Sequence, residues 1–214
     1  MDRLNGPSAL EGAISIERTR MNRALLALLI SALGLASTVS AQTTGADYQN
    51  ALTTSLASVA KTMHASIRRD VAEAAVAMPA DEYSFRPTSE VRTFAQLVGH
   101  VVNANWFFCS QAKQERPPNN TNHEALTAKD ALVKALNDSL NYCDEAYAAT
   151  TDTTFNQVVQ MLSGAGAKPV STVRGAILMF NTTHNNEHYG NLVVYMRLKG
   201  HVPPSTARTE HKTQ

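Results

Sequence analysis

The strongest constraint on this fold is that apolar residues recur at steps of three and four along four long segments. Such steps place side chains on one face of an α-helix, whereas a half-buried strand alternates at every second residue. In the first segment, the apolar positions are Tyr48, Leu52, Leu56, Val59, Met63, Ile67, Val71, Ala74 and Met78. The sequence shows no strand alternation and no internal repeat, so it predicts an all-α four-helix bundle.

The ends of the predicted helices follow from local residue chemistry. The first helix is expected to stop before Pro79 because proline cannot continue it. Thr93 and Gln96 form a capping box that opens the second helix. Residues 150–170 are a polar connection, in which we expect one short helix near Phe155–Met161.

The fourth helix is expected to begin at Ser171 or Thr172. Its stripe mixes apolar and polar side chains, which are Ile177, Asn181, His184, His188, Asn191, Tyr195 and Leu198. Gly200 suits the left-handed position that follows a helix, and the proline at 203 prevents continuation. The fourth helix is therefore expected to end just before Gly200.

The first part of the chain is predicted to be a leader rather than part of the fold. Translation is expected to start at Met21, where a basic start precedes an apolar run over Ala24–Ala36 and small residues up to Ala41. This run is too short to span a bilayer, so no membrane span is expected after cleavage near Ala41. The sequence predicts residues 1–41 as an N-terminal extension with a secretory signal peptide, residues 42–214 as one domain, and a periplasmic or secreted location.

The expected mature domain carries no net charge. The whole chain has 19 Lys and Arg against 18 Asp and Glu, and residues 1–41 hold four of the former and three of the latter, which leaves 15 against 15. Without a basic patch or a charge run, nucleic-acid binding has no electrostatic support. The expected partner is a small-molecule substrate or ligand, and the sequence leaves open whether the chain forms a homodimer.

Two histidines of the fourth helix point to a metal site. His184 and His188 are four residues apart, so their imidazoles lie one above the other on one helix face. His100, beside the apolar stripe of the second helix, is the third candidate ligand. Three imidazoles without a fourth protein ligand describe an open site, in which water or a substrate atom completes the coordination. Zn, Ni, Fe and Mn all accept imidazole, so the expected cofactor is one divalent metal ion of unspecified identity.

Other interpretations of these histidines stay open. His184 to His188 also match the H-x-x-E-H pattern of a zinc peptidase class, in which Glu187 would be the general base. That class needs a further acidic ligand and a much larger fold. The metal could instead be structural, which would make the protein a non-catalytic metal- or ligand-binding bundle. The other four histidines are expected to be ordinary, with His64 at the surface or rim.

Four parts of the chain resemble the DinB-like (DinB/YfiT-type) superfamily of small four-helix metalloproteins. They are the loop Met78–Pro87 with Glu90–Phe94, the second helix over Gln96–Trp106, the fourth helix over His184–Asn191, and the C-terminal stretch Tyr195–Ser205. Together they cover nearly the whole expected mature chain in the order that the family shows. The resemblance implies that the three histidines named above bind a metal in an up-down-down-up bundle, with a long connection between helices two and three.

The resemblance also limits the function. Some proteins of this kind are thiol-dependent transferases or isomerases, and others are known only as metal-dependent hydrolases or damage-inducible proteins. We expect an exported metal-dependent enzyme that acts on a small molecule by hydrolysis or group transfer. A pocket beside the metal, lined by Trp106, Tyr189 and Tyr195, would favour this function over the non-catalytic alternative.

Cys109 and Cys143 are the two cysteines of the chain. In an exported protein such a pair is a disulfide candidate, and the alternative is two buried free thiols. If helices two and three run parallel, as the resemblance implies, both cysteines lie near the same end of the bundle. A disulfide would then join these two helices.

Overall fold

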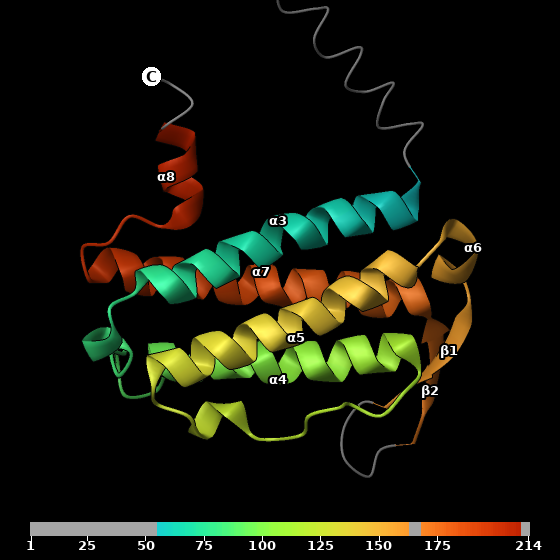
Figure 1. Cartoon of the computed structure of the whole chain (residues 1–214), viewed down its shortest axis with the longest axis horizontal. Coiled ribbons are helices and arrows are strands. Elements are labelled where there is room, and N and C mark those ends of the chain that lie inside the picture. The colour runs from blue at the N-terminus through green and yellow to red at the C-terminus, as the bar shows by residue number, and fades with distance from the viewer. Residues whose placement is uncertain (1–54, 163–167, 211–214) are drawn as a thin grey trace, which may run out of the picture. The chain divides into compact units, whose positions relative to one another are not determined.

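Four long helices form the bundle (Figure 1). The computed structural model describes residues 55–162 and 168–210, so the predicted signal peptide and positions Tyr48 and Leu52 lie outside the described residues. The long helices are α3 (Leu56–Ala77), α4 (Phe94–Lys113), α5 (Lys129–Ala149) and α7 (Arg174–Leu198). The shorter elements are η1 (Ala80–Glu82), η2 (His123–Ala125), α6 (Asp152–Phe155), β1 (Val158–Met161), β2 (Val170–Val173) and α8 (Pro204–Glu210).

The four long helices pack around one core. α4 packs against both α5 and α7, and α3 packs against the same two helices, so α3 and α4 occupy opposite corners of the bundle. Figure 1 shows α4 and α5 running in one direction, and α3 and α7 running in the other. The chain between α4 and α5 therefore travels back along the bundle and lays the 3₁₀ helix η2 against α4. Within the described ranges, no helix has both the length and the apolar character that crossing a bilayer requires.

Local residue chemistry sets several helix ends. The Thr93 hydroxyl accepts from the backbone N–H of Gln96 at 3.1 Å, and the Gln96 side chain accepts from the backbone N–H of Thr93 at 2.9 Å. These two bonds confirm the predicted capping box at the start of α4. Gly200 follows α7 with a left-handed φ of 81°, as predicted for the residue after a helix.

The segment between α5 and α7 differs from the prediction. The prediction of a short helix near Phe155–Met161 is wrong. Helix α6 ends at Phe155, the first residue of that range, and strand β1 follows. β1 pairs with β2 in antiparallel register, so Ser171 and Thr172 lie in a strand and α7 begins at Arg174. A strand of four residues is too short to show a period, and its pairing depends on a partner elsewhere in the chain.

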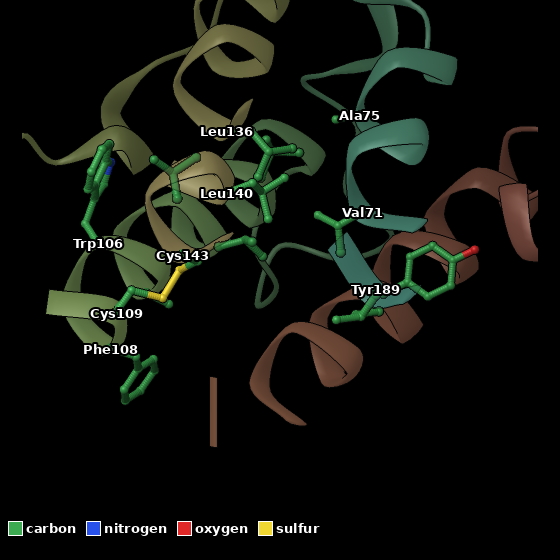
Figure 2. Close-up of a cluster of buried hydrophobic side chains, with 14 of the residues drawn as sticks. Val71, Ala75, Trp106, Phe108, Cys109, Leu136, Leu140, Cys143 and Tyr189 are labelled. Atoms are coloured by element: carbon green, nitrogen blue, oxygen red, sulfur yellow. A yellow bond between two sulfur atoms is a disulfide. The ribbon is translucent and has the colours of Figure 1, made fainter. Parts of the chain in front are cut away.

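A disulfide joins Cys109 of α4 to Cys143 of α5 (Figure 2). The two Cα atoms lie 5.2 Å apart, inside the limit of about 7 Å for such a bridge. Both residues are fully buried in the apolar core, which Figure 2 shows around them. The bridge therefore fixes the later turns of two helices that run in the same direction.

Buried amides fix the contact between α4 and α7. Asn105 Oδ1 accepts from the Nδ2 atoms of Asn181 at 2.9 Å and of Asn185 at 3.0 Å. All three side chains are fully buried, and an unpaired amide there would cost free energy. Asn185 directly follows His184 on α7, so this network sets the register of the two helices that carry the candidate ligands.

Candidate metal centre

Three histidine side chains converge where α4 packs against α7. His100 comes from α4, and His184 and His188 lie one turn apart on α7. Each offers one ring nitrogen, and these nitrogens all lie within 4.8 Å of one another. The Nε2 atoms of His184 and His188 are 3.2 Å apart. The structure thus brings together the three residues that the sequence analysis names as metal ligands.

The spacing of these nitrogens suits a bound cation. Two nitrogens that bind one tetrahedral metal at about 2.0–2.1 Å lie roughly 3.3 Å from each other. The Nε2 atoms of His184 and His188 lie 3.2 Å apart, close to that separation. The His100 ring centroid is 5.1 Å from that of His184 and 4.7 Å from that of His188, so all three rings lie against one another. Three imidazoles fit a divalent transition metal and leave a coordination position to another ligand.

Glu124 orients His100 from outside the cluster. The Nδ1–H of His100 donates to Glu124 Oε1 at 2.7 Å, which leaves the Nε2 lone pair for a metal. Glu124 Oε2 accepts from Arg92 Nε at 2.9 Å. Burial opposes ionisation of Glu124, but the hydrogen bonds from Arg92 and His100 outweigh it and hold the pKa of this carboxyl below its usual range. Such a carboxylate fixes the tautomer of the imidazole and raises its basicity as a ligand.

A glycine in α4 makes room for Glu124. A Cβ atom at Gly99 would lie 2.6 Å from the carbonyl carbon of His123 and 2.8 Å from the backbone nitrogen of Glu124, so only glycine lets η2 approach this closely. One turn further on, Asn103 Oδ1 accepts from the backbone N–H of His123 at 3.0 Å and lies 2.8 Å from its ring Nδ1. Gly99 and Asn103 therefore hold η2 beside His100, which lies between them in the sequence.

Burial keeps the two histidines of α7 neutral. It lowers the pKa of His188 to about 4, with further lowering from the imidazoles of His184 and His100. Burial also lowers the pKa of His184, and His100 adds to the effect. Metal ions bind the neutral form of imidazole. Both side chains are therefore competent to bind a metal at neutral pH.

Two cavities flank η2. The first has a volume of about 330 Å³ and is lined by Asn103, Trp106, Phe107, Pro117, Asn119, Asn120, Thr121 and Asn122. None of these lining side chains carries a charge, and Asn103 lies one turn beyond His100 on α4. The second has a volume of about 370 Å³ and includes Gln96 and Glu124 in its lining. Cavities of this size suit small organic molecules.

The three aromatic residues that were predicted to line a pocket lie in different places. Trp106 lines the first cavity, and its ring packs against Tyr142 with the centroids 4.9 Å apart. Tyr195 donates from its hydroxyl to the carbonyl oxygen of Arg92 at 2.6 Å, so it supports the residue that holds Glu124. The Tyr189 hydroxyl donates to a serine of α8 at 2.8 Å, so its polar end contacts the segment after α7.

Glu124 and Arg92 complete the site, although the sequence pattern predicted a role for neither. Glu124 lies 24 residues from His100 along the chain, in a connection without helical period, so no spacing rule links the two. Gly99 is a local hint, because glycine within a helix often marks the close approach of another backbone. That hint shows where a segment approaches α4 but does not name the segment.

His64 corrects another expectation. It was placed at the surface or rim, but only 2% of the residue is exposed. Its Nε2 donates to Asp144 at 2.8 Å, and its ring stacks on Tyr147 with the centroids 3.9 Å apart. Burial lowers the pKa of His64 although Asp144 opposes the shift. These contacts give His64 a place in the core between α3 and α5.

The sequence places this chain in a known family. Residues 63–192 match the model of the DinB superfamily, so the chain belongs to that superfamily. The matched range contains all three histidines of the cluster and Glu124. A similar curated protein is the uncharacterized protein YjoA of Bacillus subtilis (strain 168), which is 25% identical over 140 residues, covering 64% of this chain and 85% of YjoA.

Solved structures share the fold. A DinB-like protein from Bacillus cereus ATCC 10987 superimposes with a TM-score of 0.54 at 16% identity, over 64% of this chain and 89% of its own. The B. subtilis YjoA structure gives a TM-score of 0.52 at 23% identity, over 67% of this chain and 92% of its own. A mycothiol-dependent maleylpyruvate isomerase gives 0.50 at 15% identity, over 65% of this chain and 63% of its own. At these identities the similarity shows the fold alone.

Proposed function

We propose that this DinB-superfamily protein is exported, binds one divalent metal ion through His100, His184 and His188, and acts as an enzyme on a small molecule. The observation that carries the proposal is the convergence of three imidazoles, two of which place their Nε2 atoms 3.2 Å apart. The third imidazole, that of His100, donates from its Nδ1 to Glu124. A structural zinc site uses four protein ligands, whereas three leave a position for water or substrate.

Each residue of the proposed metal site has a distinct role. His184 and His188 offer neutral nitrogens from one face of α7, and Glu124 keeps His100 in the tautomer that presents Nε2 inward. When bound, such a metal lowers the pKa of a coordinated water or polarises a substrate carbonyl. The uncharged cavity of about 330 Å³ along α4 would receive the organic part of the substrate. This arrangement supports hydrolysis or group transfer.

One structural relative supports an enzymatic role. The mycothiol-dependent maleylpyruvate isomerase shares the fold with a TM-score of 0.50, so this bundle is compatible with catalysis. The proposed export would separate our chain from the thiols of the cytosol. The predicted reaction therefore does not depend on a cytosolic thiol. Mass spectrometry of the mature N-terminus tests the proposed export, for which we expect cleavage near Ala41.

Metal analysis of untagged protein, purified from its native compartment without chelator, tests the metal centre. We expect one metal ion per chain, and we expect His184→Ala and His188→Ala to lose it while keeping the helical circular dichroism spectrum. His201→Ala is the matched control, because His201 Nε2 contacts Glu82 at 2.6 Å instead of the cluster. Wild-type protein with no more metal than His184→Ala would contradict the proposal.

A second measurement separates an enzyme from a non-catalytic bundle. Protein loaded with Mn²⁺ should enhance the relaxation of bulk water protons, because an open coordination position exchanges water with the solvent. A closed site would give no such enhancement and would favour the non-catalytic alternative. Unfolding on metal removal would likewise assign the metal a structural role.

A further inference from the structure

Three phenylalanine rings meet beside the histidines of the candidate metal centre. Phe107 and Phe108 lie on α4, and Phe180 lies on α7. The Phe108 ring contacts the rings of Phe107 and Phe180, and the centroids are 5.1 Å apart in both pairs. Such separations are typical of aromatic pairs, so the three side chains form one continuous aromatic surface, which we call the phenylalanine cluster.

The phenylalanine cluster contacts one of the candidate metal ligands directly. The rings of Phe108 and His184 lie edge to face, with their centroids 5.6 Å apart. Phe180 lies one helical turn before His184 on α7, so both side chains lie on the same helix face. The Nε2 atom of His184 is in turn 3.2 Å from that of His188. The phenylalanine cluster therefore lies against the edge of the proposed metal site.

Part of the phenylalanine cluster is open to a ligand. Phe180 is 55% exposed, although a phenyl ring gains free energy when it is removed from water. A single exposed apolar side chain is ordinary, but Phe180 continues an aromatic surface that reaches a candidate ligand. Phe107, the other neighbour of Phe108, lines the cavity of about 330 Å³. A series of ring contacts therefore joins His184 to that cavity.

We propose that the phenylalanine cluster sets the substrate class of the proposed metal site, by binding an aromatic group that the substrate carries next to its metal-binding atoms. A ring placed on Phe180 and Phe108 would be removed from water and would extend an existing set of aromatic pairs. Neither the phenylalanine cluster nor the lining of the cavity carries a charge, so an uncharged ring suits both. This inference rests on the proposed metal function and adds the substrate class.

Titration of cobalt(II)-loaded protein with two hydroxamates, followed by visible absorption, tests the proposal. Acetohydroxamate and benzohydroxamate bind a metal through the same two oxygens, but only benzohydroxamate carries an aromatic ring. We expect wild type to bind benzohydroxamate more tightly. In Phe180→Ala the Kd of benzohydroxamate should rise about fivefold, because an aromatic contact is lost, whereas the Kd of acetohydroxamate should not change.

Two variants of α7 serve as controls. Phe180→Tyr keeps the aromatic ring, so it should bind both probes as wild type does. Leu198→Ala removes another exposed apolar side chain, which is 59% exposed and lies at the end of the same helix. It should leave both Kd values unchanged. Far-UV circular dichroism checks that each variant keeps the helical fold.

Three results would overturn the proposal, and each has a different meaning. An unchanged Kd of benzohydroxamate in Phe180→Ala would remove the phenylalanine cluster from substrate binding, and loss of a dimer in that variant would then assign the exposed ring to an interface between copies. An equal rise in Kd for both probes would show that Phe180 acts on the metal site rather than on the aromatic group. Wild-type protein that binds cobalt no better than His184→Ala would instead remove the proposed metal function itself.

Discussion

Gly99 and Gly190 form a matched pair that tests how α4 and η2 build the site. Both are glycines inside helices, so alanine at either position gains about 1 kcal/mol of helix propensity. At Gly190 a Cβ atom would meet nothing within 4 Å. At Gly99 it would lie 2.6 Å from the carbonyl carbon of His123 and 2.8 Å from the nitrogen of Glu124. The same substitution should therefore have opposite effects at the two positions.

The expected magnitude follows from what surrounds each glycine. The neighbours of Gly99 are backbone atoms that cannot rotate away, so η2 must move by roughly 1 Å to restore ordinary contact. Overpacking of this kind costs about 1–3 kcal/mol, which at least cancels the gain in propensity. We expect the free energy of unfolding of Gly99→Ala to be lower than that of wild type by up to about 2 kcal/mol. Gly190→Ala should be more stable than wild type by about 1 kcal/mol.

The same displacement should weaken metal binding. Moving η2 separates Glu124 from His100, which now lie 2.7 Å apart, and losing such an outer partner lowers metal affinity by about 10–100-fold. Urea denaturation of the metal-free proteins measures stability, and competition with a chelator measures affinity. A Gly99→Ala protein that is more stable than wild type and binds metal as tightly would refute the packing of η2 on α4. Gly190→Ala should keep wild-type affinity.

Three further predictions concern stability. Reduction of the Cys109–Cys143 disulfide, whose cysteines are separated by 34 positions, should lower the free energy of unfolding by about 3–4 kcal/mol on the chain-entropy model. Urea midpoints with and without reductant check this, and an unchanged midpoint together with two thiols in untreated protein would mean that no bridge forms. In the folded, metal-free protein the pKa of His188 is lowered to about 4, whereas in the unfolded chain it has its ordinary value near 6.5. Between about pH 4 and pH 6.5 the unfolded chain therefore binds more protons than the folded protein. The free energy of unfolding should fall as the pH drops through this range, by up to about 3 kcal/mol from this residue. Urea midpoints measured between pH 7 and pH 4.5 should change less with pH in His188→Gln than in wild type. Asp144→Ala removes the acceptor of the buried His64 Nε2 and should lower the free energy of unfolding by about 1–3 kcal/mol. Thermal unfolding measures this loss, and a loss below about 0.5 kcal/mol would show that the contact contributes little to stability.

The sequence by itself determined the features that depend on short spacings along one helix. Apolar steps of three and four identify a four-helix protein, because the period of a helix appears wherever one of its faces is buried. The capping box of Thr93 and Gln96 lies within one turn, so residue chemistry alone predicts it. The pair His184 and His188 is equally local, since helical spacing places both on one face whatever the rest of the chain does.

Tertiary structure alone decided the contacts between segments that are distant in the sequence. Glu124 and Arg92 support His100 because η2 packs on Gly99, and no residue period reports that approach. The pairing of β1 with β2 and the burial of His64 against α5 were missed for the same reason. The cysteine pair stayed ambiguous until the parallel course of α4 and α5 placed their Cα atoms 5.2 Å apart. Such contacts depend on which helix faces pack together and at what register, and these are properties of the packed bundle rather than of any one helix.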